Sequence, residues 1–291
     1  MSIGEIFDRA LTVYLKRWQP FSLLAALTML PDTVFQFYKY LVVRATDFPT
    51  SAGAPVPSLS WQLVWTIMGG EVRHQNFNYF WLTEGSFLVI VTFTNAAFIA
   101  GFLAVVRGEP VSAGSWLSQW LGKASRLLGI SLVWIIVLAA FLASVGLLSV
   151  SITAGAALLH TRQLDGVAIA LLLILLLVYA LVGAPFAFSP FIATLEDVPA
   201  VKSVRSAIAR TLGRRFWRTV AINLGLALLA YSLFYAEDAL GALLFYWSRS
   251  PELATALHAV LRLPVFAFNA LVMCAYYYDT RLRESMTPAQ Q

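Results

Sequence analysis

The chain has 291 residues, of which 59% are hydrophobic and only 12% are charged, and its mean hydropathy is +0.75. A water-soluble domain carries about a quarter charged residues, so this composition excludes a soluble domain and predicts an integral membrane protein. The net charge of +5 is also found in nucleic-acid-binding proteins. In a membrane chain, however, basic residues first report orientation, and we expect no nucleic acid as a partner.

The first expected element is an amphipathic helix at the start of the chain. Ser2 and Glu5 have the S-x-x-E spacing of a capping box, in which each side chain bonds a free backbone N–H of the first turn. Apolar residues recur behind them at helical spacing. They are Ile3, Ile6, Phe7, Ala10, Leu11, Tyr14 and Trp18.

Six apolar stretches reach the roughly 20 residues that a membrane-spanning helix requires. They cover residues 21–43, 86–106, 127–159, 167–195, 219–247 and 259–278. Pro185 and Pro190 favour a kink near the end of the fourth, because proline lacks the N–H that the helix needs. We therefore predict an all-α, polytopic membrane protein in which residues 1–291 form a single membrane domain.

The basic residues predict the orientation of these spans. The segments 1–20, 107–126, 196–218 and 279–291 hold 14 of the 20 Lys and Arg residues. Positive charge concentrates on the cytoplasmic side, so both termini are expected in the cytoplasm, with the chain in the bacterial inner membrane.

The longest outer segment, residues 44–85, contains prolines followed by aromatic residues. Aromatic side chains favour the headgroup region, so we expect this segment to lie on the outer surface, with a short helix at 59–68. The aromatic residues are Trp61, Trp65, Phe77, Tyr79, Phe80 and Trp81.

Three cytoplasmic segments share one design, an amphipathic helix followed by two spans. The second of these helices carries Trp116 and Trp120 on one face, and the third covers residues 200–218. The pattern predicts three interfacial helices and a pseudo-threefold repeat, with units 1–107, 108–195 and 196–291.

The third helix, 200–218, is the most basic segment of the chain. Asp197 is expected to cap it, with Pro199 just inside. Its expected apolar stripe is Val201, Val204, Ile208, Leu212 and Phe216, and its expected headgroup-facing cations are Lys202, Arg210, Arg214 and Arg218. Anionic lipid headgroups are therefore the predicted partner, since each cation near such a surface contributes about 1 kcal/mol. Arg205 and Arg215 fall within the apolar arc, so they must snorkel to the surface or pair with Glu196 or Asp197.

Three stretches of the chain resemble a known family. GEIFDRALTVYLKRW at the start, SPFIATLEDVPAVKSVRSAIARTLGRRFWR in the centre and CAYYYDTRLRE at the end are similar to bacterial proteins grouped as the glycerophosphoryl diester phosphodiesterase membrane domain. The resemblance spans nearly the whole chain and implies a membrane domain without the catalytic barrel of fused members.

Catalytic and metal-binding motifs are not found in the sequence. The three histidines, His74, His160 and His258, stand on separate predicted loops, without H-E-x-x-H or H-x-H spacing. One cysteine and dispersed histidines do not form a zinc ligand set. We expect neither an enzyme, nor a metal, nor a cofactor.

Charged residues within the spans mark a candidate polar cavity, because each is costly in lipid and must face protein or water. Asp32 and Lys39 lie in the first span, Glu237 and Asp238 in the fifth, and Arg262 in the sixth. Lining an outward-facing cavity, they would bind an acidic headgroup; the alternative is that they are interface residues and a structural ion pair.

Three functions remain open. The first is a non-enzymatic membrane protein that binds or organises lipids or other amphiphiles. The second is an accessory or scaffolding subunit of a larger membrane complex. A transporter is the weakest of the three, because no inverted pair of broken helices is evident.

Overall fold

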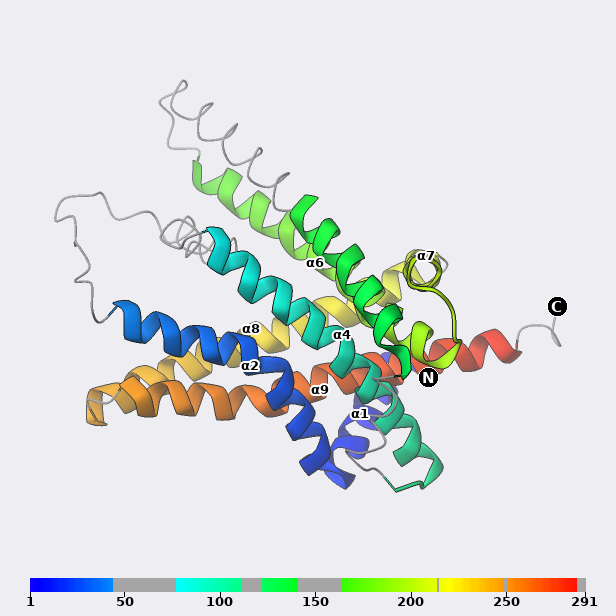
Figure 1. The fold of residues 1–291 in the computed structure, drawn as a ribbon, viewed down its shortest axis with the longest axis horizontal. Helices are drawn as coiled ribbons and strands as arrows, with labels where there is room; N and C mark the ends of the chain where they lie inside the picture. The colour runs from blue at the N-terminus through cyan, green and yellow to red at the C-terminus, as the bar shows by residue number, and fades with distance from the viewer. Residues whose placement is uncertain (44–76, 111–121, 141–163, 214, 249–250, 287–291) are drawn as a thin grey trace.

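The computed structural model describes residues 1–43, 77–110, 122–140, 164–213, 215–248 and 251–286. In these residues every regular element is a helix (Figure 1), so the all-α prediction is confirmed for them. Three helical stretches are long and apolar enough to cross a membrane, Gly85–Arg107, Gly122–Ala140 and Val260–Ser285. They coincide with the second, third and sixth expected spans, and the other three stay predictions.

Helix α1 (Ile3–Lys16) begins with the predicted capping box. The Glu5 backbone N–H donates to Ser2 Oγ at 3.2 Å, and the Ser2 N–H donates to Glu5 Oε2 at 2.5 Å. The buried face of α1 consists of Ile6, Ala10 and Val13, whose spacing of four and three residues forms one ridge. This ridge packs α1 against α9 (Pro251–Met286), and α2 (Trp18–Val43) follows directly.

Helix α4 (Phe77–Arg107) begins earlier than the expected residue 86. Phe77, Tyr79, Phe80 and Trp81 therefore belong to the helix and not to a surface loop, because neither Gly nor Pro interrupts the chain before Gly85. The expected helix at 59–68, with Trp61 and Trp65, lies outside the described residues.

A glycine caps the C-terminus of α4. Gly108 has φ of +74°, and its N–H donates to Val105 O while the Glu109 N–H donates to Ala104 O at 2.8 Å. This pair of bonds is a Schellman motif, which needs a residue in the left-handed region.

A tryptophan and a serine connect the helix Gly122–Ala140 to α6 (Leu164–Leu195). Pro190 has no N–H to offer the carbonyl of Phe186, four residues earlier, and Ser189 Oγ donates to that carbonyl at 3.0 Å instead. The same Oγ accepts the indole N–H of Trp134 at 2.9 Å. The carbonyl oxygen of Phe186, which the buried Pro190 leaves without its backbone donor, thus accepts a hydrogen bond from a neighbouring side chain.

The third amphipathic segment differs from its prediction. Helix α7 (Ala200–Leu212) ends before Gly213, and α8 (Phe216–Ser248) begins three residues later, so no single helix covers 200–218. Glycine is the weakest helix former after proline, which accounts for the break. Asp197 does not cap α7: its φ is +55°, and Pro199 occupies the N-cap position without a side-chain bond.

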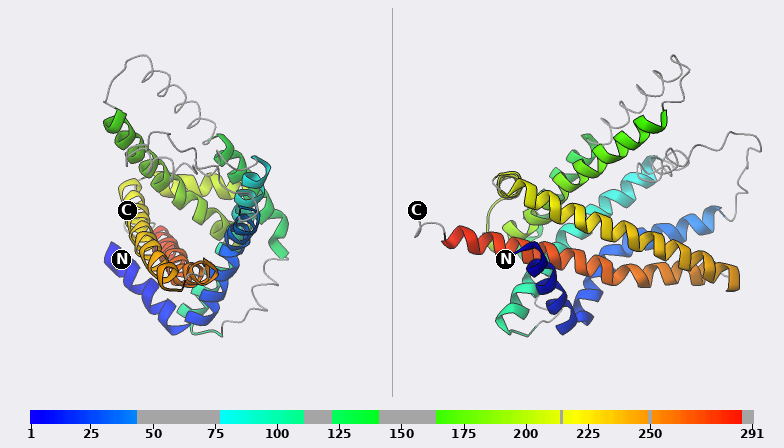
Figure 2. Two further views of the ribbon diagram at one scale, coloured as in Figure 1. Left: turned by 90° about the vertical axis from the view of Figure 1, so that its left-hand side faces the viewer. Right: turned by 180° about the vertical axis from the view of Figure 1, so that it is seen from behind.

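Helix α9 lies at the centre of the bundle, in contact with α1, α2, α4, α6 and α8. In Figure 1 α2, α4, α6 and α9 approach one another near α1 and the N-terminus, and the far ends of α2, α4 and α6 spread apart; α8 and α9 come together at their far ends, and Figure 2 shows them running side by side. We call the converging end the base. The order of one short and two long helices recurs in α1, α2, α4 and in α7, α8, α9. The repeat itself stays a prediction, because residues 111–121 lie outside the described part.

Candidate functional site

Two clusters of charged side chains lie at the base. The first, which we call the Glu196 network, connects the end of α6 to α7 and α9. Glu196 receives two hydrogen bonds from the guanidinium of Arg210, at 2.5 and 3.2 Å, and a third from the Tyr277 hydroxyl at 2.9 Å. Glu284 lies 3.5 Å from Arg210 and 3.6 Å from Arg215. Two arginines thus meet two carboxylates.

The electrostatics of the Glu196 network hold both partners in their charged forms. Partial burial raises the pKa of Glu196, but the hydrogen bonds from Arg210 and Tyr277 and the charge of Arg210 outweigh it, and the pKa falls below the ordinary 4.5. Burial lowers the pKa of Arg210, whereas the hydrogen bond to Glu196 raises it, and the net shift is upward. Glu196 and Arg210 are therefore both charged at neutral pH.

The second cluster, the Asp279 network, joins the two ends of the chain. The Asp279 carboxylate, only 4% exposed, lies 2.8 Å from the Met1 amino group, 2.9 Å from Arg218 Nη1 and 3.0 Å from Arg283 Nε. Arg218 and Arg283 also donate to the carbonyl oxygen of Met1, the latter at 3.0 Å. The Asp279 carboxylate is thus in contact with three cations.

Aromatic rings support the Asp279 network. The guanidinium of Arg218 lies 5.6 Å from the ring centre of Tyr276, and that of Arg9 lies 5.0 Å from the ring centre of Tyr278. The Tyr276 hydroxyl shares a 2.6 Å hydrogen bond with Thr219. Such cation–π contacts fix long side chains at modest entropic cost.

A smaller group of contacts supports the turn between α6 and α7. Arg126 forms an ion pair with Asp197, and Lys123 donates to the carbonyl oxygen of Thr194. A cation at this point also suits the negative end of the α6 dipole. Of the two arginines expected to snorkel or to pair, Arg215 forms an ion pair, with Glu284 and not with Glu196 or Asp197, and Arg205 is exposed.

Apolar side chains are exposed on both flanks of the base. On α7 the buried residues are Ser203, Val204, Ala207 and Thr211, so of the predicted apolar stripe only Val204 is buried, and Val201, Ile208 and Leu212 are exposed. We define the α7 ridge as Val201 (72% exposed), Arg205, Ile208 (40%) and Leu212 (42%). On α1 the corresponding ridge, the α1 ridge, consists of Leu11 (44% exposed) and Leu15 (65%) and continues to Trp18 (55%) at the start of α2.

The predicted membrane-surface residues lie in different environments in the structure. Lys202 is exposed on α7, but Arg210 and Arg218 lie within the two charged networks and are not simple surface cations. Arg214, Trp116 and Trp120 lie outside the described residues. Contact of these residues with a membrane surface stays a prediction.

For most residues of the predicted polar cavity, the structure describes the backbone and not the side chain. Asp32 and Lys39 lie on α2, Glu237 and Asp238 on α8, and Arg262 is half-buried on α9. The first four side chains are outside the described part, so the cavity stays a prediction.

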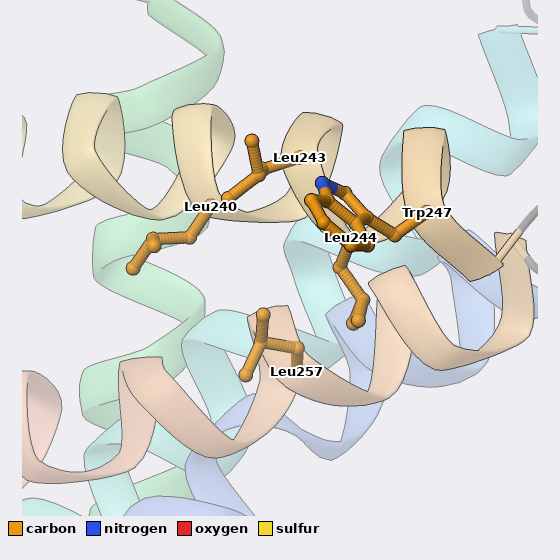
Figure 3. A pocket seen from close by; sticks show the side chains of 5 residues that line it. All are labelled: Leu240, Leu243, Leu244, Trp247 and Leu257. Atoms are coloured by element: carbon orange, nitrogen blue, oxygen red, sulfur yellow. The ribbon is translucent and has the colours of Figure 1, made fainter.

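A different feature lies at the far end of α8 and α9. A shallow groove of about 400 Å³ separates the two helices there, and it is lined by apolar side chains (Figure 3). Its lining residues are Leu240, Leu243, Leu244, Trp247 and Leu257. The groove suits a hydrocarbon chain and not a polar headgroup.

Metal chemistry has no support within the described residues, where no three His, Cys, Asp or Glu side chains gather closely enough to hold an ion. His74 and His160 are outside those residues, as is the side chain of His258. No known protein family, curated protein or solved structure matches this chain.

The sequence analysis predicted neither of the two charged networks, although one feature of the sequence contains residues of both. The stretches that carry the family resemblance, LED at 195–197 and YYDTRLRE at 277–284, contribute Glu196, Tyr277, Asp279, Arg283 and Glu284 to the networks. A cluster of charged residues at the end of an apolar span is costly unless it is paired. That cost could have directed the search for partners to these stretches.

Proposed function

We propose that this chain is a non-enzymatic protein of the bacterial inner membrane, with six spanning helices and cytoplasmic termini, that binds and organises anionic lipids at the cytoplasmic surface. The α7 ridge is the observation that carries the proposal. It places Arg205 among exposed apolar residues, with Lys202 beside it, while the opposite face of α7 packs on α6. Such a surface suits the boundary between acyl chains and headgroups.

The dimensions of α8 support this placement in a bilayer. Trp217 and Trp247, near its two ends, are 77% and 79% exposed. At 1.5 Å per residue they are about 45 Å apart, close to the thickness of a bilayer with its headgroups. Tryptophan favours both interfaces, so α8 suits a helix that crosses the whole membrane with the base inside.

The family resemblance is also part of the proposal. Residues of its two most specific stretches form the charged networks that tie α6, α7, α8 and α9 at the base. A shared structural core is a physical reason for such a pattern to recur among related membrane domains.

The lipid surrounding the protein tests the proposed function. Membranes that contain the chain would be solubilised directly in polymer-bounded discs, and the anionic lipid fraction in purified discs would be compared with that of the bulk membrane. We expect enrichment for the unaltered chain and reduced enrichment for the double variant Lys202→Gln/Arg205→Gln, since each cation contributes about 1 kcal/mol. The charge-preserving control Lys202→Arg/Arg205→Lys should keep the enrichment. Equal lipid composition in discs and bulk membrane would refute the proposal.

A second candidate function is that of a subunit in a larger membrane complex. The helix Gly122–Ala140 favours it, because only 22% of the residues in its apolar stretch are buried. Leu128, Leu132 and Ile136 form an exposed ridge on this helix. Purification in mild detergent, followed by mass measurement, distinguishes the two. A stoichiometric foreign polypeptide supports the subunit, and a lone chain with bound phospholipid supports the lipid-binding protein.

A further inference from the structure

The contacts between α1 and α9 show which side of α1 faces the interior of the bundle. The Phe7 ring meets Phe268 with ring centres 5.9 Å apart, whereas the Arg9 guanidinium lies 5.0 Å from the ring centre of Tyr278. Phe268 precedes Tyr278 by ten residues, or about 15 Å along α9, and Tyr278 is the nearer to the base. The Phe7 side of α1 therefore faces into the span, and the Arg9 side faces out of it.

The α1 ridge continues the Phe7 side of the helix. Leu11 and Leu15 follow Phe7 by four and eight residues, which is a row along one side of a helix. Trp18, at the start of α2, extends this row beyond the end of α1. All three residues of the α1 ridge are exposed at the level where α1 meets the base, so they suit the upper part of acyl chains.

Two cations lie where the α1 ridge ends. Lys16 follows Arg9 by seven residues, about two turns, and so lies on the side that faces out of the span. Arg17 is the next residue, in the turn before α2. Both are exposed, and no ion pair holds either side chain within the described residues. The exposed acids of α1, Glu5 and Asp8, belong to its first half, so positive charge is concentrated at its end.

Hydrogen bonds fix the junction between α1 and α2. The Tyr14 hydroxyl shares a 3.1 Å hydrogen bond with Ser22 Oγ on α2, and the Arg17 N–H donates to the Tyr14 carbonyl oxygen at 3.1 Å. Val13 and Phe21, on either side of the turn, are buried in the main hydrophobic core. A ligand at this junction would meet a backbone that is already ordered, which lowers the entropic cost of binding.

We propose that the junction between α1 and α2 is a second binding surface for an anionic phospholipid, with Lys16 and Arg17 at its phosphate and the α1 ridge against its acyl chains. Charge complementarity decides the ligand, because two unpaired cations beside an apolar row attract an anionic headgroup and gain nothing from a zwitterionic one. This surface extends the proposed function and rests on it, since the base must face the cytoplasmic leaflet.

Fluorescence quenching at a single cysteine tests the junction in a bilayer. Thr12 is exposed one turn before Lys16, so a fluorophore on Thr12→Cys would report the lipids beside the two cations. The native Cys274 is buried and should not react. The full chain would be reconstituted in phosphatidylcholine with a small fraction of phosphatidylglycerol or phosphatidylcholine that carries a nitroxide high on one acyl chain. We expect the labelled phosphatidylglycerol to quench more strongly at equal mole fraction.

The charge variants identify the groups responsible. Lys16→Gln/Arg17→Gln should lower the preference for phosphatidylglycerol by about fivefold for each cation removed, whereas Lys16→Arg/Arg17→Lys should keep it. Lys202→Gln/Arg205→Gln on α7 should also leave the preference at this junction unchanged. All these side chains are exposed, so unchanged melting temperatures are expected and would show that the variants fold.

A second labelled position serves as the matched control for the site. Gly4 is exposed on the acidic half of α1, about 12 Å before Thr12, and a Cβ there would meet no atom within 4 Å. A fluorophore on Gly4→Cys should therefore be quenched to the same extent by both lipids.

Equal quenching by the two lipids at Thr12→Cys, or a preference that survives Lys16→Gln/Arg17→Gln, would overturn the surface. An equal preference at Gly4→Cys and Thr12→Cys would do the same, because it would reflect the charge of the whole base. If anionic lipid remains enriched in polymer discs in any of these cases, the proposed function stands without this surface; if that enrichment is absent as well, both fail.

Discussion

The Tyr277 hydroxyl donates a 2.9 Å hydrogen bond to Glu196 Oε1, and so connects α9 to the end of α6 across 81 residues of sequence. The same hydroxyl lies 3.4 Å from Arg210 Nη1, which makes it both donor and acceptor. The contact joins three helices through one carboxylate, so the stability of the base depends on Glu196.

Replacing Glu196 by glutamine should destabilise the protein by about 1–3 kcal/mol, because a half-buried guanidinium then loses its closest counter-charge. Thermal unfolding in detergent would measure the change. Asp197→Asn is the matched control, since Asp197 is the adjacent residue and forms an exposed pair with Arg126, which should contribute little. Equal melting temperatures for the two variants would contradict the central role of Glu196.

The lowered pKa of Glu196 predicts how the stability of the protein depends on pH. The pKa of Glu196 is below 4.5 in the folded chain, so its contribution is complete above about pH 4.5 and disappears as the pH falls through the lower, folded value. The charged groups around it are Arg210, Arg281 and Glu284. The difference in melting temperature between the unaltered chain and Glu196→Gln should therefore be constant from pH 7 to about 5 and shrink below about 4.5. A difference that grows on acidification would be inconsistent with a lowered pKa.

Sequence patterns predicted the elements whose causes are local. The Ser2–Glu5 capping box needs only four consecutive residues, and the structure contains it. Three of the six apolar stretches likewise predicted helices that are long and apolar enough to cross a membrane. The ends of helices were less predictable: α9 continues through Asp279 to Met286 because its charged residues find partners on other elements.

The partners of the charged residues could not be predicted from the pattern of one helix. Arg210 and Glu196 are 14 residues apart, whereas Met1 and Asp279 are 278 residues apart, and only the packing of the helices brings either pair together. The orientation of α7 was missed for a related reason. In a membrane protein the protein-facing side is often the one with small residues, and Ser203, Ala207 and Thr211 occupy it here.

Close approach of helices leads to a prediction about two glycines. A Cβ at Gly129 would lie 2.9 Å from the Cβ of Ala200, and neither atom can rotate away. Gly129→Ala should therefore destabilise the protein by about 1–3 kcal/mol, by forcing the helix Gly122–Ala140 away from α7. At Gly225 the nearest atom, Cζ of Phe7, would be 3.9 Å away, so Gly225→Ala should be neutral or stabilising through its better helix propensity. A lower melting temperature for Gly225→Ala than for Gly129→Ala would contradict this packing.

Labelling of single cysteines tests the predicted orientation. Leu253 is 54% exposed near the start of α9, and Ser285 is exposed near its end, about 48 Å away at 1.5 Å per residue. The native Cys274 is fully buried, so the unaltered chain should give little background. If the base is cytoplasmic, a membrane-impermeant maleimide added to intact cells should label Leu253→Cys and not Ser285→Cys.

Permeabilised cells provide the control for this experiment, because both substituted chains should then be labelled to similar extents. Labelling of Ser285→Cys in intact cells would place the base, with its basic residues, on the outer surface. That result would contradict the positive-inside orientation and, with it, the assignment of the α7 ridge to the cytoplasmic leaflet.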